Sequence, residues 1–231
     1  MIAQRLPSLL LCSALAACAS TDVGNPITAE IQFAGYETDA PQADALVLDS
    51  GLTINSAVIK VRSFKLDRSA NCDDMSTDFE GTVLVDLLSQ TMSASALWDG
   101  ESDTYCRLRL QFTTEEIGSA TSGWSVMVTG TTSNDEAFTA TVDAEDTLSL
   151  SGPFTLPEGS HLLQVGFFLN EWFVADGQDI FGDNLVLDSS HPRYEILRAN
   201  IATSARLFHD SDQNGVLDTE EIARSLAVGG N

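Results

Sequence analysis

Alternation of apolar and polar residues with a period of two constrains this fold more than any other feature of the chain. A strand with one face in a core and one face in solvent has this pattern. Turn-forming residues separate the candidate strands, and no helical periodicity interrupts them before Glu171. The candidate strands are residues 27–33, 46–48, 52–66, 79–88, 106–112, 124–131, 138–142, 147–150, 154–156 and 162–169.

Short strands separated by turns predict a mainly β fold, and we expect an antiparallel Greek-key β-sandwich over residues 27–189. Two segments resemble the β-sandwich domains of bacterial lipoproteins of unknown function. They are Val83-Leu84-Val85-Asp86-Leu87-Leu88 and Tyr105-Cys106-Arg107-Leu108-Arg109-Leu110. The resemblance implies an immunoglobulin- or transthyretin-like sandwich without an established chemistry.

Charge excludes some partners. Acidic residues number 34 against 11 basic ones, which gives a formal net charge of −23. A chain this acidic is repelled by nucleic acid and by anionic lipid surfaces, so we expect no nucleic-acid partner. Its hydrophobic content of 43% is ordinary for a globular protein with a packed core.

The N-terminus has the features of an export signal. Arg5 is followed by an apolar run over residues 6–17, which is too short to span a bilayer and typical of a signal peptide. We expect residues 1–17 to be the signal and residues 18–26, which lack apolar periodicity, to be a flexible tether.

The end of this signal, Leu15-Ala16-Ala17-Cys18, resembles a bacterial lipobox. The resemblance implies cleavage before Cys18, a lipid on its thiol and attachment to a membrane of the cell envelope. Ala19 follows the cysteine where an Asp would favour the inner membrane, so the resemblance implies the outer membrane. The alternative is an ordinary secretory signal cut near the same small residues.

Two cysteines remain once Cys12 is removed with the signal and Cys18 is lipidated. Cys72 and Cys106 would then lie in an oxidising compartment, and we expect them to form a disulfide. No His or further Cys stands at metal-ligand spacing near either cysteine, which argues against a role in metal binding.

The C-terminal part, residues 190–231, changes to helical spacing. Pro192 suits a first helical position, with Ser190 or His191 as the cap. An apolar stripe predicts a helix that leads into residue 210, and a short exit helix is expected over 219–227. The stripe consists of Tyr194, Leu197, Ile201, Ala205 and Phe208.

Residues 210–221 resemble the twelve-residue calcium loop of an EF-hand. Ca²⁺ prefers oxygen ligands, and the oxygen-bearing residues stand at the ligand positions of such a loop, with Gly215 at the sharp turn and Leu217 as the apolar anchor. The predicted ligands are Asp210, Asp212, Asn214, the Val216 carbonyl, Asp218 and Glu221.

The segment before the loop departs from the EF-hand pattern. His209 and Arg206 stand where apolar residues are usual, and the sequence contains no second loop for pairing. We therefore expect a single structural Ca²⁺ site of extracellular affinity, on the order of 10⁻⁴–10⁻³ M, rather than a cytosolic switch.

Motifs of catalysis are missing from the sequence. It has no Gly-x-Ser-x-Gly elbow and no His-Glu-x-x-His zinc motif, and its three histidines lie far apart. We expect a non-catalytic envelope protein. A glycan- or protein-binding adhesion module, with Trp98, Trp124 and Trp172 as candidate contacts, and a hydrolase with a carboxylate site are the alternatives.

Overall fold

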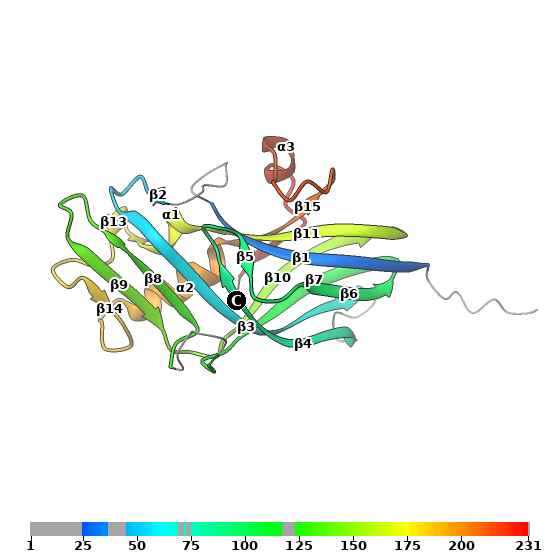
Figure 1. Ribbon diagram of the computed structural model, residues 1–231, viewed down its shortest axis with the longest axis horizontal. Helices are drawn as coiled ribbons and strands as arrows, with labels where there is room; N and C mark the ends of the chain where they lie inside the picture. Colours follow the sequence, from blue (N-terminus) through cyan, green and yellow to red (C-terminus); the bar gives the residue numbers. More distant parts are fainter. Residues whose placement is uncertain (1–24, 37–44, 69–71, 73–74, 117–122, 231) are drawn as a thin grey trace, which may run out of the picture.

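The computed structural model describes residues 25–36, 45–68, 72, 75–116 and 123–230. Strands dominate this part of the chain, and three helices lie in its C-terminal third (Figure 1). The strands are β1 (Pro26–Tyr36), β2 (Leu46–Val47), β3 (Thr53–Arg68), β4 (Met75–Asp86), β5 (Thr91–Met92), β6 (Ala96–Glu101), β7 (Asp103–Phe112), β8 (Val126–Thr131), β9 (Ala137–Val142), β10 (Thr147–Leu156), β11 (Gly159–Phe168), β12 (Val174–Ala175), β13 (Gln178–Asp179), β14 (Val186–Leu187), β15 (Ala205–Asp210) and β16 (Ala227–Gly229). The helices are α1 (Leu169–Trp172), α2 (Tyr194–Ser204) and α3 (Thr219–Ile222).

The described strands confirm the mainly β prediction, but they form one continuous sheet and a separate β12–β13 pair rather than two stacked antiparallel sheets. The main sheet runs β14-β9-β8-β3-β7-β10-β16-β15-β11-β1-β6, with β2 and β4 also on β3 and β5 on β4. It curls, with β1 and β11 side by side toward the right of the view and β3 running obliquely through the middle of the molecule (Figure 1).

The sheet is also mixed, which the expected antiparallel sandwich did not include. β1 pairs with β11 in parallel, from Ile27 opposite Gly159 to Tyr36 opposite Phe168, and β14 pairs with β9 in parallel. Alternation along a strand reports which face is buried, but it carries no information about which distant strand is the neighbour or in which direction it runs.

The curl encloses one large apolar core. Inward side chains of β1, β3, β7, β8, β10 and β11 form it, with Phe33, Ile59 and Leu110 among the fully buried ones. α1 and α2 add Trp172 and Ile201 to the same cluster. Among the described residues, no helix is long and apolar enough to cross a membrane.

The predicted disulfide between Cys72 and Cys106 is present, with the two Cα atoms 5.9 Å apart. Asp67, which is fully buried, lies beside it and accepts hydrogen bonds from Arg107 Nε and Arg109 Nη2, both at 2.7 Å. Arg107 Nη2 also donates to the Cys72 carbonyl oxygen at 2.7 Å. The ion pairs therefore join β3 and β7 to the disulfide.

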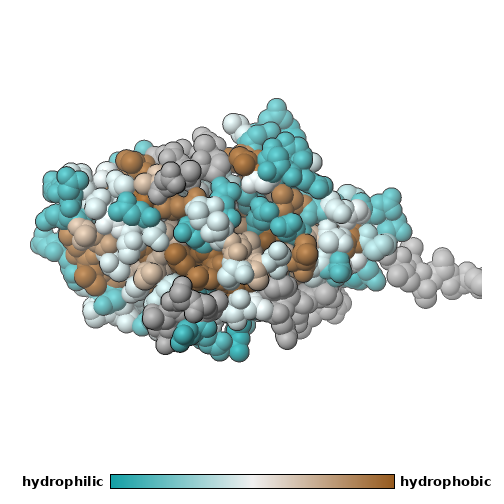
Figure 2. Space-filling view, in the orientation of Figure 1, coloured by the Kyte–Doolittle hydropathy of each residue, from teal (hydrophilic) through white to brown (hydrophobic). Residues whose placement is uncertain are grey.

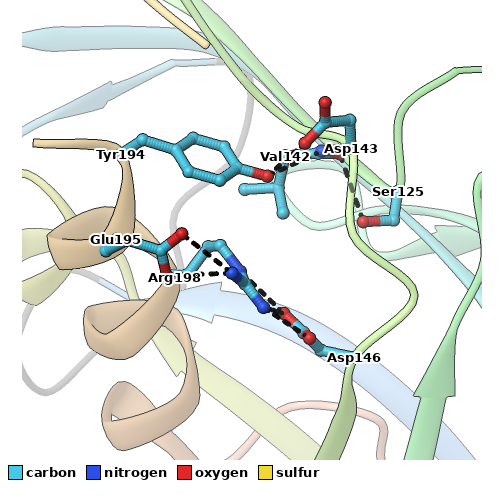
Figure 3. A network of polar contacts seen from close by, with 7 residues as sticks. All are labelled: Ser125, Val142, Asp143, Asp146, Tyr194, Glu195 and Arg198. Carbon is cyan, nitrogen blue, oxygen red and sulfur yellow. Dashed lines mark hydrogen bonds and ion pairs between the residues drawn. The ribbon is translucent and has the colours of Figure 1, made fainter. Parts of the chain in front are cut away.

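Helix α2 packs against the sheet through polar contacts at one end (Figure 3). Arg198 binds the Asp146 carboxylate through Nε and Nη2, and its Nη1 binds Glu195. Burial raises the pKa of Tyr194 to about 12, and its hydroxyl donates to Asp143 Oδ1. These contacts tie α2 to the loop between β9 and β10.

The helix expected to lead into residue 210 is wrong beyond Ser204. α2 ends at Ser204, and the next residues form β15, which pairs with β11 from Phe167 opposite Ala205 to Leu162 opposite Asp210. Sheet pairing outweighs the helical spacing of the sequence here. A strand, not a helix, therefore enters the candidate calcium loop, which is the segment where the sequence already departed from the EF-hand pattern.

Candidate metal site

The candidate metal site lies in residues 210–221, which connect β15 to β16 through α3. This unit projects from the body of the molecule in Figure 1, and in Figure 2 its surface is mainly hydrophilic. Beneath it, a small apolar cluster of Ala34, Tyr36, Phe168, Phe208 and Leu217 is separate from the main core. Leu217, the expected anchor, is 2% exposed and confirms that part of the sequence interpretation.

Asp210 ends β15 and is the most unusual residue of the loop. Its side chain is fully buried. The Gly215 amide donates to Oδ2 at 2.7 Å, but Oδ1 has no hydrogen-bond partner among the described residues. Burial raises the pKa of this carboxyl, and the neighbouring Asp212 and Glu221 raise it further. A buried carboxylate oxygen without a partner is costly unless another group compensates it.

Three predicted ligands come together at this position. Oxygen atoms of Asp210, Asp212 and Glu221 all lie within 4.8 Å of one another. The three residues come from the end of β15, the loop and α3, so the turn of the chain between these elements brings the carboxylates together. Like charges this close repel each other, and a divalent cation between them would remove the repulsion.

Glu221 reaches back across the loop, as the twelfth residue of a calcium loop does. Its Oε1 accepts hydrogen bonds from the Ser211 amide and hydroxyl, both at 2.6 Å, and its Oε2 accepts from the Asp218 amide at 3.0 Å. Burial acts to raise the pKa of Glu221, but these hydrogen bonds prevail and hold the pKa below its usual value. The carboxylate is therefore kept ionised.

Asp218 lies outside the group of three, and one of its carboxylate oxygens caps α3. Its Oδ1 accepts from the Glu220 and Glu221 amides at 2.7 and 2.9 Å, and with Glu221 it forms a capping box. The expected exit helix over 219–227 is shorter than predicted, because α3 ends at Ile222 and Ala227–Gly229 return to the sheet as β16.

The middle of the loop is shaped by Asn214 and Gly215. Asn214 Nδ2 donates to Asp212 Oδ2 at 2.7 Å, and its Oδ1 accepts from the Val216 amide at 2.7 Å. Gly215 has a φ of +82°, a backbone conformation that residues other than glycine adopt only at a cost in free energy. Asn214 is thus bonded to one of the three carboxylates, that of Asp212, and the backbone amide of Val216 is bonded to Asn214.

Two glutamines fix the loop to the sheet. Gln164 on β11 accepts a hydrogen bond from the Tyr36 hydroxyl and donates to the Gly215 carbonyl oxygen at 3.4 Å. Gln213 Nε2 donates to the Ser160 carbonyl oxygen at 3.0 Å. Burial, followed by the charges of Asp210 and Glu221, raises the pKa of Tyr36, so its hydroxyl stays protonated and remains a donor.

A histidine pair beside the loop could not be predicted from sequence spacing. His161 and His209 are distant along the chain, but β11 and β15 are neighbours in the sheet, and His161 Nδ1 lies 3.2 Å from His209 Nε2. A hollow of about 240 Å³ lies beside His209, lined also by Ser211, Asp218 and Glu221 among others. The third histidine, His191, accepts a hydrogen bond from the Arg193 amide in the turn before α2. The expected cap is wrong, because Arg193 is the N-cap of α2, no side chain caps the helix, and Pro192 lies before it.

The other predicted site residue, Cys18, lies outside the described residues. The three tryptophans do not form an exposed row: Trp98 is 4% exposed, Trp172 is fully buried, and Trp124 stacks on the buried Lys60 with its ring centre 3.8 Å from Nζ. The aromatic contacts considered for glycan binding are therefore mostly core residues.

Comparison with known proteins gives no further assignment. No protein-family model matches the chain, and neither a curated protein nor a solved structure is significantly similar to it. Function is therefore argued from the geometry of the site.

Proposed function

We propose that this protein is a non-catalytic, lipid-anchored envelope protein whose C-terminal loop binds one structural Ca²⁺. The observation that carries the calcium proposal is Asp210, whose buried Oδ1 has no partner in the part of the chain that the structure describes and whose neighbours are the carboxylates of Asp212 and Glu221. A hard divalent cation satisfies that oxygen and offsets the repulsion among the three charges. Asn214, the Val216 carbonyl and Asp218 would complete an all-oxygen shell.

A structural role for the ion follows from the connections of the loop. The loop joins β15 to β16, and β16 pairs with β10 on its other side. Within the described part of the sheet, β16 is the strand that links β10 to β15. Ordering the loop therefore holds the two halves of the sheet together, and we propose that Ca²⁺ acts mainly on stability.

Calcium binding is tested by titrating the purified protein with Ca²⁺ in a calorimeter and by recording its thermal unfolding in millimolar Ca²⁺ and in chelator. For a dissociation constant on the order of 10⁻⁴–10⁻³ M, 10 mM Ca²⁺ adds about 1.4–2.7 kcal/mol to the free energy of unfolding. An unchanged melting curve in Ca²⁺ and in chelator would contradict the proposal.

Glu221→Gln and Glu220→Gln form a matched pair for this test. Both residues are in the first turn of α3, but Glu221 is in the group of three carboxylates, whereas Glu220 is exposed. We expect the first change to abolish the calcium response and the second to leave it. Equal loss in both variants would point to general charge screening instead of a site.

The lipid anchor is a separate part of the proposal and rests on the lipobox Leu15-Ala16-Ala17-Cys18. Labelling with radioactive palmitate in a bacterial host should mark the wild-type protein and place it in the outer-membrane fraction. Cys18→Ala should remove the label and release the protein. A labelled Cys18→Ala variant would assign the lipid to another residue and overturn this part.

No specific observation favours either alternative function, the adhesion module or the hydrolase. Glycan binding by stacked aromatics needs exposed rings, and Trp98 and Trp172 are buried. A hydrolase needs carboxylates free to act in a cleft. In the hollow of about 200 Å³ between α2 and the sheet, Asp146 and Glu195 both bind Arg198.

A further inference from the structure

The strongest feature outside the calcium loop is the contact between His161 and His209. The chain has only three histidines, and the sheet brings two of them together on adjacent strands. His161 is 7% exposed, and its Nδ1 lies 3.2 Å from Nε2 of His209. Imidazole nitrogens are the usual protein ligands of Zn²⁺, Cu²⁺ and Ni²⁺, whereas Ca²⁺ prefers oxygen.

The protonation state of His161 follows from its second contact. Its Nε2 lies 2.7 Å from the carbonyl oxygen of Pro157, which only accepts hydrogen bonds. Nε2 must therefore carry the proton in the neutral ring, and the lone pair of Nδ1 faces His209. A backbone carbonyl that holds the far nitrogen of an imidazole is the usual support of a metal-binding histidine.

His209 can offer a lone pair to the same point. In the contact as it stands, His209 Nε2 donates its proton to His161 Nδ1. A neutral imidazole can carry its single proton on either nitrogen, so a shift of that proton to Nδ1 frees the Nε2 lone pair without any change in charge. Both nitrogens would then face one position between β11 and β15.

The separation of the two nitrogens matches a shared metal ion. With metal–nitrogen bonds of about 2.0–2.1 Å, two ligand nitrogens lie about 2.9 Å apart at a right angle and about 3.3 Å apart at the tetrahedral angle. The observed 3.2 Å lies within this range. His209 also lines a hollow of about 240 Å³, which is large enough to hold water.

We propose that His161 and His209 form a second cation site, which takes a divalent transition-metal ion through two imidazole nitrogens. This site differs from the calcium loop in ligand type, since the loop offers oxygen. A bound ion would bridge β11 and β15 next to the point where β15 enters the loop. The proposal does not depend on calcium binding by the loop.

The test uses Cu²⁺, which binds nitrogen ligands most tightly among the divalent ions of this series. The full chain is kept in excess Ca²⁺, so that carboxylates are occupied, and one equivalent of Cu²⁺ is added. We expect an electron paramagnetic resonance spectrum with coupling to two imidazole nitrogens, and competition by Zn²⁺. A wild-type spectrum with oxygen ligands only would overturn the proposal, whatever the variants do.

Variants locate the site. His161→Asn and His209→Asn should each weaken Cu²⁺ binding by at least about tenfold, as expected for loss of a ligand. His191→Asn, at the remaining histidine, should leave the affinity and the spectrum unchanged. Asp210→Asn should keep the coupling to two imidazole nitrogens, which separates this site from the calcium loop. Unaltered binding in either His161→Asn or His209→Asn would contradict the assignment.

Discussion

The Gly215 amide donates a 2.7 Å hydrogen bond to one carboxylate oxygen of Asp210, and the other oxygen is buried without a partner among the described residues. One half of the carboxylate thus shapes the turn, and the other half is left for a ligand. A buried charge in this state destabilises the loop until a cation compensates it. This relationship makes the effect of a substitution depend on calcium.

Asp210→Asn should have opposite effects with and without calcium. In millimolar Ca²⁺ the variant loses the stabilisation of about 1.4–2.7 kcal/mol that the ion supplies to the wild type. In chelator it should be as stable as the wild type or more stable, because a neutral amide does not repel Asp212 and Glu221. Thermal unfolding of both proteins under both conditions measures this. Destabilisation of the same size in chelator would show that Asp210 is structural without an ion.

The sequence predicted which carboxylates of this loop come together better than it predicted the elements around them. Oxygen-bearing residues, a glycine and a buried leucine at fixed spacing are local properties, and the structure places Asp210, Asp212 and Glu221 together as that spacing requires. The entering element is set by pairing of Ala205–Asp210 with β11, which is a long-range contact. Periodicity over a few residues contains no information on such a contact.

The same reasoning explains the rest of the fold. The alternation of apolar and polar residues predicted most of the long strands. The Cys72–Cys106 disulfide was predicted by elimination, because the other two cysteines were assigned to the signal and the lipid. The segment around Asp99-Gly100 lies outside the candidate strands of the sequence, but it forms part of β6 and pairs with β1, with Asp99 opposite Thr28. The contact of His161 with His209 also depends on strand order, so it was visible only once β11 and β15 were known to be neighbours.

Gly229→Ala should loosen β16. A Cβ atom at Gly229 would lie 2.0 Å from the Ala202 carbonyl oxygen, so the strand must move away from α2. We expect faster amide hydrogen exchange at the β16 partners Leu150 and Arg206, and a loss of unfolding free energy of about 1–3 kcal/mol. Gly230→Ala is the control, because open space surrounds that position. Equal exchange in the two variants would show that β16 does not hold the sheet.

Asp67→Ala should be among the most destabilising changes in the described part of the chain. It leaves Arg107 and Arg109 without their common buried partner, and removing one member of a buried ion pair typically costs about 3–5 kcal/mol. Both arginines keep about a quarter of their side-chain surface exposed, with 28% and 26%, so water recovers part of this and we expect about 2–4 kcal/mol. Denaturant unfolding measures it. Glu171→Gln, at an exposed pair with Arg206, should change stability by less than about 1 kcal/mol.

Tyr194→Phe should remove a hydrogen bond whose contribution to the free energy of unfolding depends on pH. The Tyr194 hydroxyl, followed by the Ser189 side chain, lowers the pKa of Asp143 by hydrogen bonding. Because the folded-state pKa lies below the unfolded one, this contribution is complete above the unfolded value, near pH 4, and is lost as pH falls through the folded value. Asp143 is exposed, so solvent screens the interaction, and we expect a loss of about 1 kcal/mol or less at pH 7.

Denaturant unfolding of the wild type and of Tyr194→Phe at pH 7 and pH 3 tests this prediction. The difference between the two proteins should shrink as the pH falls below about 4, because protonation of Asp143 weakens the hydrogen bond that its carboxylate accepts from Tyr194. Tyr36→Phe is the comparison, since Tyr36 donates to the neutral side chain of Gln164 and not to a carboxylate. Its effect should not follow the titration of Asp143. A difference for Tyr194→Phe that stays constant from pH 7 to pH 3 would show that the hydroxyl acts by packing alone.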